Sequence, residues 1–168
     1  KSLGTGIIAT GIKKGLATQD SIEDAINSMS YLNKNSAQEL REHNVNAVTD
    51  VTGFGLLGHL KEMCENSDVS SKVNFQDLLF LDGARELAMS GVMPGGTKRN
   101  LKSVEKVVSF SDHLSEIEQL LSADAQTSGG LLISMPMKDA KSYVKKVNNR
   151  TTIIGQITEK RPYLIKVD

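Results

Sequence analysis

The sequence lacks the features that mark extracellular or membrane proteins. Its only cysteine is Cys64, so no disulfide can form within the 168 residues. No apolar run approaches the roughly 20 residues that a membrane-spanning helix needs. No secretory or transit signal is visible at the start. We therefore expect a cytoplasmic protein without a membrane partner.

A net charge of either sign is also missing. The 20 Lys and Arg residues balance the 20 Asp and Glu residues. A balanced surface does not attract a polyanion as a whole, so we expect no nucleic-acid partner, although a local phosphate site stays open. The sequence has no internal repeat, low-complexity tract or long linker. At 168 residues it is long enough to bury a core as one domain.

Short apolar runs alternate with helical patterns along the chain. Residues 6–12 form an apolar run between glycines and are predicted to be a buried strand. Further strands are expected at 48–51, 73–75, 131–135, 151–157 and 163–167. The link between the last two is too short for a parallel crossover, so we expect an antiparallel pair there. The pattern predicts an α/β (α+β layered) fold, a mixed β-sheet covered by helices.

Helix-start and turn signals separate these strands. The candidate helix caps are Thr18 or Asp20, Asp82 and Asp112. Gly91 is placed to end a helix in a left-handed conformation. Residues 93–100 contain Pro-Gly-Gly and are predicted to be a loop, as are residues 124–130, which are also rich in glycine.

The stretch VTDVTGFGLLGHL at 48–60 joins a strand, an acidic residue, a glycine-rich turn and a helix. Apolar residues recur at Leu57, Leu60 and Cys64, which is one face of a helix. A carboxylate such as that of Asp50 attracts Mg²⁺, and helix N-termini attract phosphate. However, Asp and Thr are also ordinary helix caps, and glycine is ordinary in tight turns. Local chemistry leaves both interpretations open.

Three motifs in order favour the ligand-binding interpretation over a plain helix cap: TDVTGFGLLGHL at 49–60, PGGTKRN at 94–100 and DAQTSGGLL at 124–132. Together they resemble the C-terminal half of selenophosphate synthetases (selenide, water dikinases). The opening KSLGTGI at 1–7 is similar to the family's entry into this domain, with Ser2 where proline is more usual. The resemblance covers essentially all of the chain. It implies the C-terminal-domain fold of the aminoimidazole ribotide synthetase-like superfamily.

The resemblance also implies a domain organisation. Residues 1–168 would be a single domain, the C-terminal domain of a larger two-domain enzyme whose N-terminal ATP-binding and catalytic domain is absent. The start at Lys1, without a methionine, agrees with an excised domain. The family's reactive cysteine or selenocysteine belongs to the absent domain. We therefore expect no catalytic residue here, and we expect Cys64 to be a core residue.

The resemblance makes Asp50 the expected magnesium ligand. The residues expected to surround the nucleotide are Thr49, Thr52, Gly53, Gly95, Gly96, Thr97, Lys98 and Asn100. They offer amide, hydroxyl, ammonium and carboxamide groups, which suit phosphate oxygens. A purely structural role remains the alternative for each of them. His59 is expected to be a packed or surface residue rather than a catalytic one, and the loop at 124–130 is expected to be architectural.

The implied activity is that of the whole enzyme, which converts ATP, selenide and water to selenophosphate, AMP and phosphate with Mg²⁺. The full-length protein is expected to be a homodimer that meets ATP and selenide through the missing domain. The isolated fragment is expected to fold but to be inactive. Two alternatives stay open: a non-catalytic regulatory or binding homologue, and a related ATP-dependent synthetase of purine biosynthesis. The residue at the reactive position upstream would decide whether the protein is the non-catalytic homologue.

Overall fold

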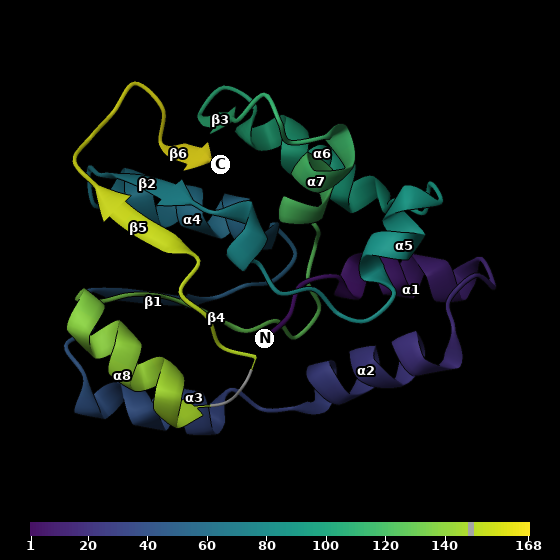
Figure 1. The fold of residues 1–168 in the computed structure, drawn as a ribbon, viewed down its shortest axis with the longest axis horizontal. Coiled ribbons are helices and arrows are strands. Elements are labelled where there is room, and N and C mark those ends of the chain that lie inside the picture. Colours follow the sequence, from purple (N-terminus) through teal and green to yellow (C-terminus); the bar gives the residue numbers. More distant parts are fainter. Residues whose placement is uncertain (148–149) are drawn as a thin grey trace.

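The computed structural model describes residues 1–147 and 150–168 (Figure 1). The helices are α1 (Thr5–Lys13), α2 (Gln19–Ser30), α3 (Lys34–Glu39), α4 (Gly55–Asn66), α5 (Ala84–Met89), α6 (Gly95–Val104), α7 (Glu116–Ser122) and α8 (Met137–Val147). Two 3₁₀ turns are η1 (Leu40–Glu42) and η2 (Phe75–Asp77). The strands are β1 (Ala47–Asp50), β2 (Ser70–Val73), β3 (Val108–Phe110), β4 (Leu131–Ser134), β5 (Gly155–Thr158) and β6 (Ile165–Val167). None of the helices within these described ranges is both long and apolar enough to cross a membrane.

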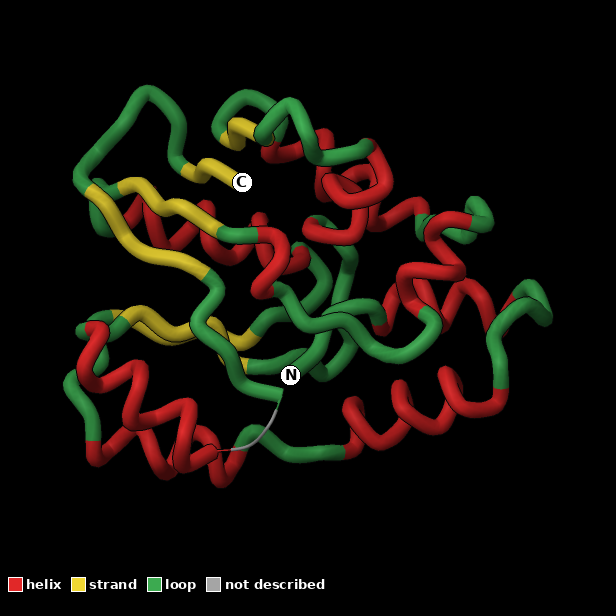
Figure 2. The backbone as a smooth tube through the Cα atoms, in the orientation of Figure 1, coloured by secondary structure: helices red, strands yellow, loops and turns green. Residues whose placement is uncertain are grey.

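The strands form two sheets. β1 and β4 make an antiparallel ribbon in which Ala47 lies opposite Ser134 and Asp50 opposite Leu131. The other sheet has the order β3-β6-β2-β5, with β5 antiparallel to β2 and the other neighbours parallel. In Figure 2 the strands lie in the left half of the view, and α1, α2 and α5 in the right half. The prediction of a mixed sheet with covering helices is confirmed.

Helix α4 is the central element of the core. It contacts both sheets as well as α6 and α7. Leu57, Leu60 and Cys64 are buried on it, as their spacing predicts, and Leu56 is buried with them. Figure 1 shows α3 and α8, which pack against each other, on the side of the ribbon away from the four-stranded sheet. The strand β1 and the start of α4 are therefore packed against the rest of the core.

Residues 6–12 are part of helix α1, so the prediction of a strand there is wrong. Ile7, Ile8 and Gly11 are buried on one face of the helix. The amides at its start donate to side chains more than a hundred positions away, those of Asp124 and Gln126. Free amides at a helix start need acceptors. Because these acceptors come from a distant segment, the local sequence carries no capping signal.

The Pro-Gly-Gly segment is the second difference. Residues 95–104 form α6, with Pro94 at its N-cap, so the loop predicted over 93–100 is wrong beyond its first two residues. Proline is tolerated at a helix start because the amide that it lacks has no partner there anyway. Gly95 and Gly96 occupy the first turn of α6, so no earlier helical turn offers carbonyl acceptors to their amides. The Pro-Gly-Gly segment therefore forms the N-terminus of α6.

The expected helix caps are confirmed in part. Thr18 caps α2, because its hydroxyl accepts a hydrogen bond from the amide of Ser21. Helix α7 instead begins after Ser115, whose side chain forms a capping box with Glu118, so Asp112 is not its cap. Likewise α5 follows Gly83, which has a φ of 74° and no side-chain cap, so the prediction for Asp82 is wrong.

Gly91 has a φ of 81°, as predicted for a left-handed helix end. The predicted pairing of the last two strands is wrong, since β2 lies between β5 and β6. β6 instead runs parallel to β2 and β3. Residues 131–135 were expected to form a buried strand, but only Leu132 is buried in β4. Phe75 lies in η2 rather than in a strand.

Candidate functional site

Asp50 lies at the end of β1, where the chain leaves the ribbon. Its side chain is exposed. No hydrogen bond or salt bridge joins its carboxylate to any other residue that the structure describes. The neighbouring hydroxyl of Thr49 donates to the backbone oxygen of Asp50 at 3.3 Å. The strand therefore presents an unpaired carboxylate to solvent at the position that the sequence indicates.

His59 holds the turn that follows Asp50. The backbone N–H of Thr52 donates to Nε2 of His59 at 3.2 Å, and the Thr52 hydroxyl lies at the same distance from that nitrogen. Since Nε2 accepts, we infer that the ring proton is on Nδ1, which lies 3.5 Å from the carboxylate of Glu62. His59 is buried, so it is packed rather than on the surface. Thr52 is thus oriented by the helix that it precedes.

Asn100 connects α6 to this turn. Its side-chain amide donates to the backbone oxygen of Gly53 at 2.9 Å and to that of Ala123 at 3.2 Å. Gly53 itself is exposed and has open space around it. The amide group of Asn100 is therefore engaged in holding the site together, which favours the structural alternative for this residue.

The start of α6 is the cationic part of the site. Gly95 and Lys98 are exposed there, and Gly96 is half-buried. The amides of the first turn have no acceptor within the helix, and the helix dipole adds partial positive charge. Because Asn100 joins α6 to the turn after Asp50, these amides and the carboxylate belong to one structural unit.

Thr97 differs from its neighbours because it is fully buried. Its hydroxyl donates to Oδ1 of Asp124 at 2.7 Å. In this structure that hydroxyl is not available to a ligand from solvent. The geometry favours a positioning role for Thr97 over the direct nucleotide contact expected from the sequence.

Asp124 is the polar residue whose contacts the sequence analysis missed. It is 1% exposed, and its Oδ2 accepts from the amides of Gly6 and Ile7 and from the side chain of Gln126. Burial raises the pKa of this carboxyl to about 6, against the lowering effect of the hydrogen bonds. The available signal was an acidic residue heading the Gly-rich motif at 124–132. These contacts favour the architectural role expected for the loop, and its acidic residue lies buried among them.

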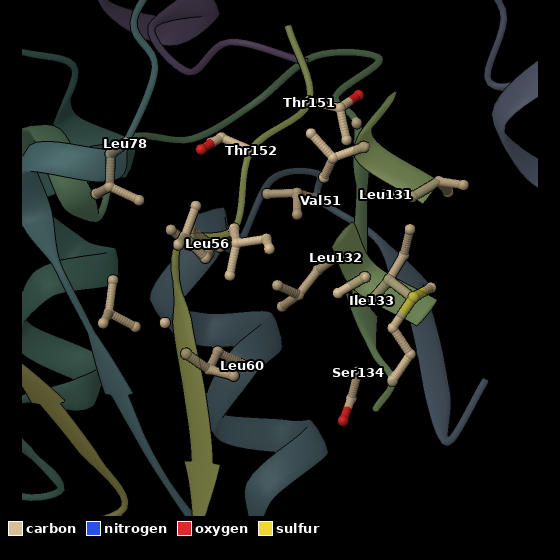
Figure 3. Close-up of a pocket in the computed structure, with 18 of the residues that line it drawn as sticks. Val51, Leu56, Leu60, Leu78, Leu131, Leu132, Ile133, Ser134, Thr151 and Thr152 are labelled. Atoms are coloured by element: carbon tan, nitrogen blue, oxygen red, sulfur yellow. The ribbon is translucent and has the colours of Figure 1, made fainter. Parts of the chain in front are cut away.

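A separate cavity of about 430 Å³ lies between the β1–β4 ribbon and the chain leading into β5 (Figure 3). Val51, Leu56, Leu60 and Leu132 are among the aliphatic side chains that line it, and Asp50 is not part of its wall. Its wall also includes polar and cationic residues such as Lys1 and Lys72, so the lining is mixed rather than apolar. Across residues 1–147 and 150–168, no three His, Cys, Asp or Glu side chains gather into a metal-binding group. Asp50 therefore offers one ligand and not a complete metal site.

Comparisons with known proteins agree with the motifs. Residues 1–167 match the family described as AIR synthase related protein, C-terminal domain. The chain is 39% identical over 161 residues to a selenide, water dikinase of Aliarcobacter butzleri. This alignment covers 94% of this chain and 46% of that protein. It is 39% identical over 171 residues to the selenide, water dikinase of Caldanaerobacter subterraneus subsp. tengcongensis, covering 99% of this chain and 49% of that protein. The chain thus spans about half the length of these relatives.

Solved structures share the fold at low identity. The hydrogenase maturation protein HypE superposes with a TM-score of 0.64 at 16% identity, over 94% of this chain and 42% of that one. Thiamine monophosphate kinase from Aquifex aeolicus gives a TM-score of 0.57 at 14% identity, over 99% and 47%. A further structure, described as AaThiL complexed with AMPPCP and TMP, gives 0.56 at 15% identity, over 100% and 45%. At such identities the likeness establishes the fold alone.

Proposed function

This chain belongs to the AIR synthase related protein family, C-terminal domain, and from that premise we propose that it is the C-terminal domain of a selenide, water dikinase. Residues 1–168 are, in this proposal, one domain of a larger two-domain enzyme. The whole enzyme converts ATP, selenide and water to selenophosphate, AMP and phosphate. The identities of 36–39% to relatives with this name, over most of this chain, support the proposal.

The observation that carries the proposal is the carboxylate of Asp50. It is exposed and unpaired among the described residues, at the exit of a strand that packs on the core. Such a carboxylate is suited to bind a cation, because the strand fixes where it leaves the backbone and no ion pair with a described residue has to be broken first. Its position, in the motif that first identified the family, agrees with the expected role.

The site fits one shared magnesium ligand. Mg²⁺ keeps several waters and is commonly bound by one or two carboxylates together with substrate phosphates. Asp50 would supply one such carboxylate, and the other ligands would come from the nucleotide and the absent domain. When bound, Mg²⁺ offsets the negative charge that develops as the terminal phosphoryl group moves.

The start of α6 would bind phosphate oxygens. The amides of Gly95 and Gly96 and the ammonium group of Lys98 provide hydrogen-bond donors and positive charge there. Thr49, Thr52, Gly53, Thr97 and Asn100 shape the site through the contacts described above. In this proposal the residues at the start of α6 contact the ligand, and the other residues hold them in position.

The wider setting follows from the same proposal. ATP and selenide bind with the N-terminal domain, the full-length protein is a cytoplasmic homodimer, and nucleic acid and membranes are not partners. A chain of the same fold, AaThiL, has been solved in complex with AMPPCP, which supports nucleotide binding on this fold. The balanced charge of the chain supports the absence of a nucleic-acid partner.

The test is an assay of the full-length protein with Mg-ATP and selenide, followed by ³¹P NMR. We expect selenophosphate, AMP and phosphate to appear together, only when selenide is present. Residues 1–168 alone are expected to give none of them. A full-length protein that binds ATP but forms no selenophosphate would favour the regulatory homologue, and turnover with a purine precursor would favour the related synthetase.

A further inference from the structure

The motif segments of the chain meet at the carboxylate of Asp124. From the opening segment, the amides of Gly6 and Ile7 donate to its Oδ2 at 3.1 and 3.4 Å. From the Pro-Gly-Gly segment, the hydroxyl of Thr97 donates to Oδ1 at 2.7 Å. From its own segment, the side chain of Gln126 donates to Oδ2 at 3.1 Å. One buried group thus joins the starts of α1 and α6.

The same segment also touches the turn that follows Asp50. The amide of Gln126 donates to the backbone oxygen of Thr52 at 3.1 Å. A Cβ atom on Gly55 would lie only 2.7 Å from the oxygen of Ala123 and 2.8 Å from that of Asp124, so the two backbones are in close contact. Residues 123–126 therefore lie between the turn after Asp50 and the start of α6.

We propose that Asp124 is a positioning residue, which fixes the start of α6 relative to the turn after Asp50 and thereby sets the affinity of the site for a magnesium-nucleotide complex. This inference rests on the proposed function, because it concerns the same site. Asp124 does not touch the ligand. It acts through Thr97, whose neighbours Gly96 and Lys98 belong to the anion-binding turn.

The hydrogen bonds to Asp124 favour its ionised form, although burial outweighs them and raises the pKa of the carboxyl. Three N–H donors converge on Oδ2 of Asp124, and the Thr97 hydroxyl, which can donate or accept, donates to Oδ1, so an ionised carboxylate accepts from all four groups. No charged side chain contributes to the shift of the Asp124 pKa, so these neutral donors alone stabilise the charge. Asparagine has nearly the same shape, but its N–H group would face Thr97 and leave the buried hydroxyl proton of Thr97 without this acceptor. Asp124→Asn therefore weakens the connection between the starts of α1 and α6 rather than the packing around them.

The experiment uses the full-length protein with Asp124→Asn, and Asp112→Asn as a control at an exposed carboxylate. Mg-ATP binding is measured by calorimetry, and kcat and KM for ATP by steady-state kinetics. We expect Asp124→Asn to weaken Mg-ATP binding and raise KM about tenfold, the effect typical of a supporting residue, with a smaller change in kcat. Amide hydrogen exchange should accelerate at the starts of both α1 and α6.

Thr97 variants keep the inference testable where Asp124→Asn does not fold. Thr97→Val removes only the connection to α6, so KM should rise while exchange at α1 stays as in the parent. Thr97→Ser keeps the hydroxyl and should recover most of the affinity that Thr97→Val loses. Lower thermal stability with unchanged Mg-ATP affinity in these variants would overturn the inference.

The two proposals fail separately. A parent protein that makes no selenophosphate, yet loses Mg-ATP affinity on Asp124→Asn, would refute the proposed function and support the positioning role. An active parent protein whose Mg-ATP affinity is unchanged by Asp124→Asn would do the reverse.

Discussion

The side-chain amide of Asn100 donates a hydrogen bond of 2.9 Å to the backbone oxygen of Gly53. This contact joins α6 to the turn that follows Asp50, across 47 positions of sequence. Each side of it carries one part of the proposed site: an exposed carboxylate on the strand side, and amides without an acceptor in their own helix on the helix side. The relation between these two parts, rather than either alone, decides whether a metal-bound phosphate chain can be held.

Replacement of Asp50 tests the metal ligand directly. In the full-length protein, Asp50→Asn should lower kcat/KM for ATP by roughly 100-fold, about 2.7 kcal/mol, because an amide binds Mg²⁺ far more weakly than a carboxylate. The melting temperature should stay unchanged, since the side chain is exposed and unpaired among the described residues. Kinetics over a range of Mg²⁺ concentrations measure the effect. The same Mg²⁺ dependence in variant and parent would remove Asp50 from the metal site.

Gly55 tests the close contact between the turn and residues 123–124. Gly55 has a φ of 71°, and a Cβ there would meet two carbonyl oxygens, so Gly55→Ala should destabilise the chain by about 3 kcal/mol. Gly91→Ala is the matched control: φ is 81°, but nothing lies within 4 Å of the added carbon. It should cost only the backbone strain, about 1 kcal/mol. Equal losses in urea unfolding would contradict the close contact.

The structure and the sequence pattern assign different residues as the cap of α7, so substitutions there can distinguish them. Ser115→Ala removes the capping box with Glu118 and should cost about 1 kcal/mol of unfolding free energy. Asp112→Ala alters the residue that the sequence pattern favoured as the cap, and it should change stability by less than about 0.5 kcal/mol. Denaturant unfolding measures both. A larger loss for Asp112→Ala would return the capping role to that residue.

The pH dependence of stability tests the burial of Asp124. Its folded-state pKa, about 6, lies above the value of 3.8 for a free side chain, so the folded protein binds more protons between these values. The group therefore stabilises the fold fully below about pH 4, and this contribution is lost as the pH rises through about 6. Burial of Asp124 is nearly complete, which leaves little screening by solvent.

From about pH 4.5 to about pH 6.5 the parent should lose about 2 kcal/mol of unfolding free energy relative to Asp124→Asn, whose amide does not titrate. Asp24, Glu39 and Glu118 have lowered pKa values, so their contributions have the opposite sign and change at lower pH. Urea unfolding of both proteins at several pH values gives the difference. Parallel curves would show that Asp124 is not buried as an ionisable group.

Sequence patterns predicted those elements whose signals are local. The helix after Asp50 was expected because apolar residues recur at its buried face. The cap of α2 was expected at Thr18 or Asp20, and the hydroxyl of Thr18 forms it by accepting from an amide three residues on. Asp50 was expected to be a magnesium ligand from the family motif, and the structure adds that its side chain is exposed. The family motifs added the type of site, though not which motif residues meet a ligand and which hold the fold.

Other features depended on contacts between distant segments. The apolar run of α1 suits a strand as well as a helix, and its start is capped by side chains more than a hundred residues away. The burial of Thr97 depends on Asp124 in the same way. β2 separates β5 from β6 because strand order follows packing and not proximity in sequence. The sequence by itself determined the family, the layered fold and the acidic residue at the strand exit, since periodicity and motif are written along the chain. Only the tertiary structure decided how the motifs meet, because a buried polar group takes its partners from whatever segments the core brings beside it.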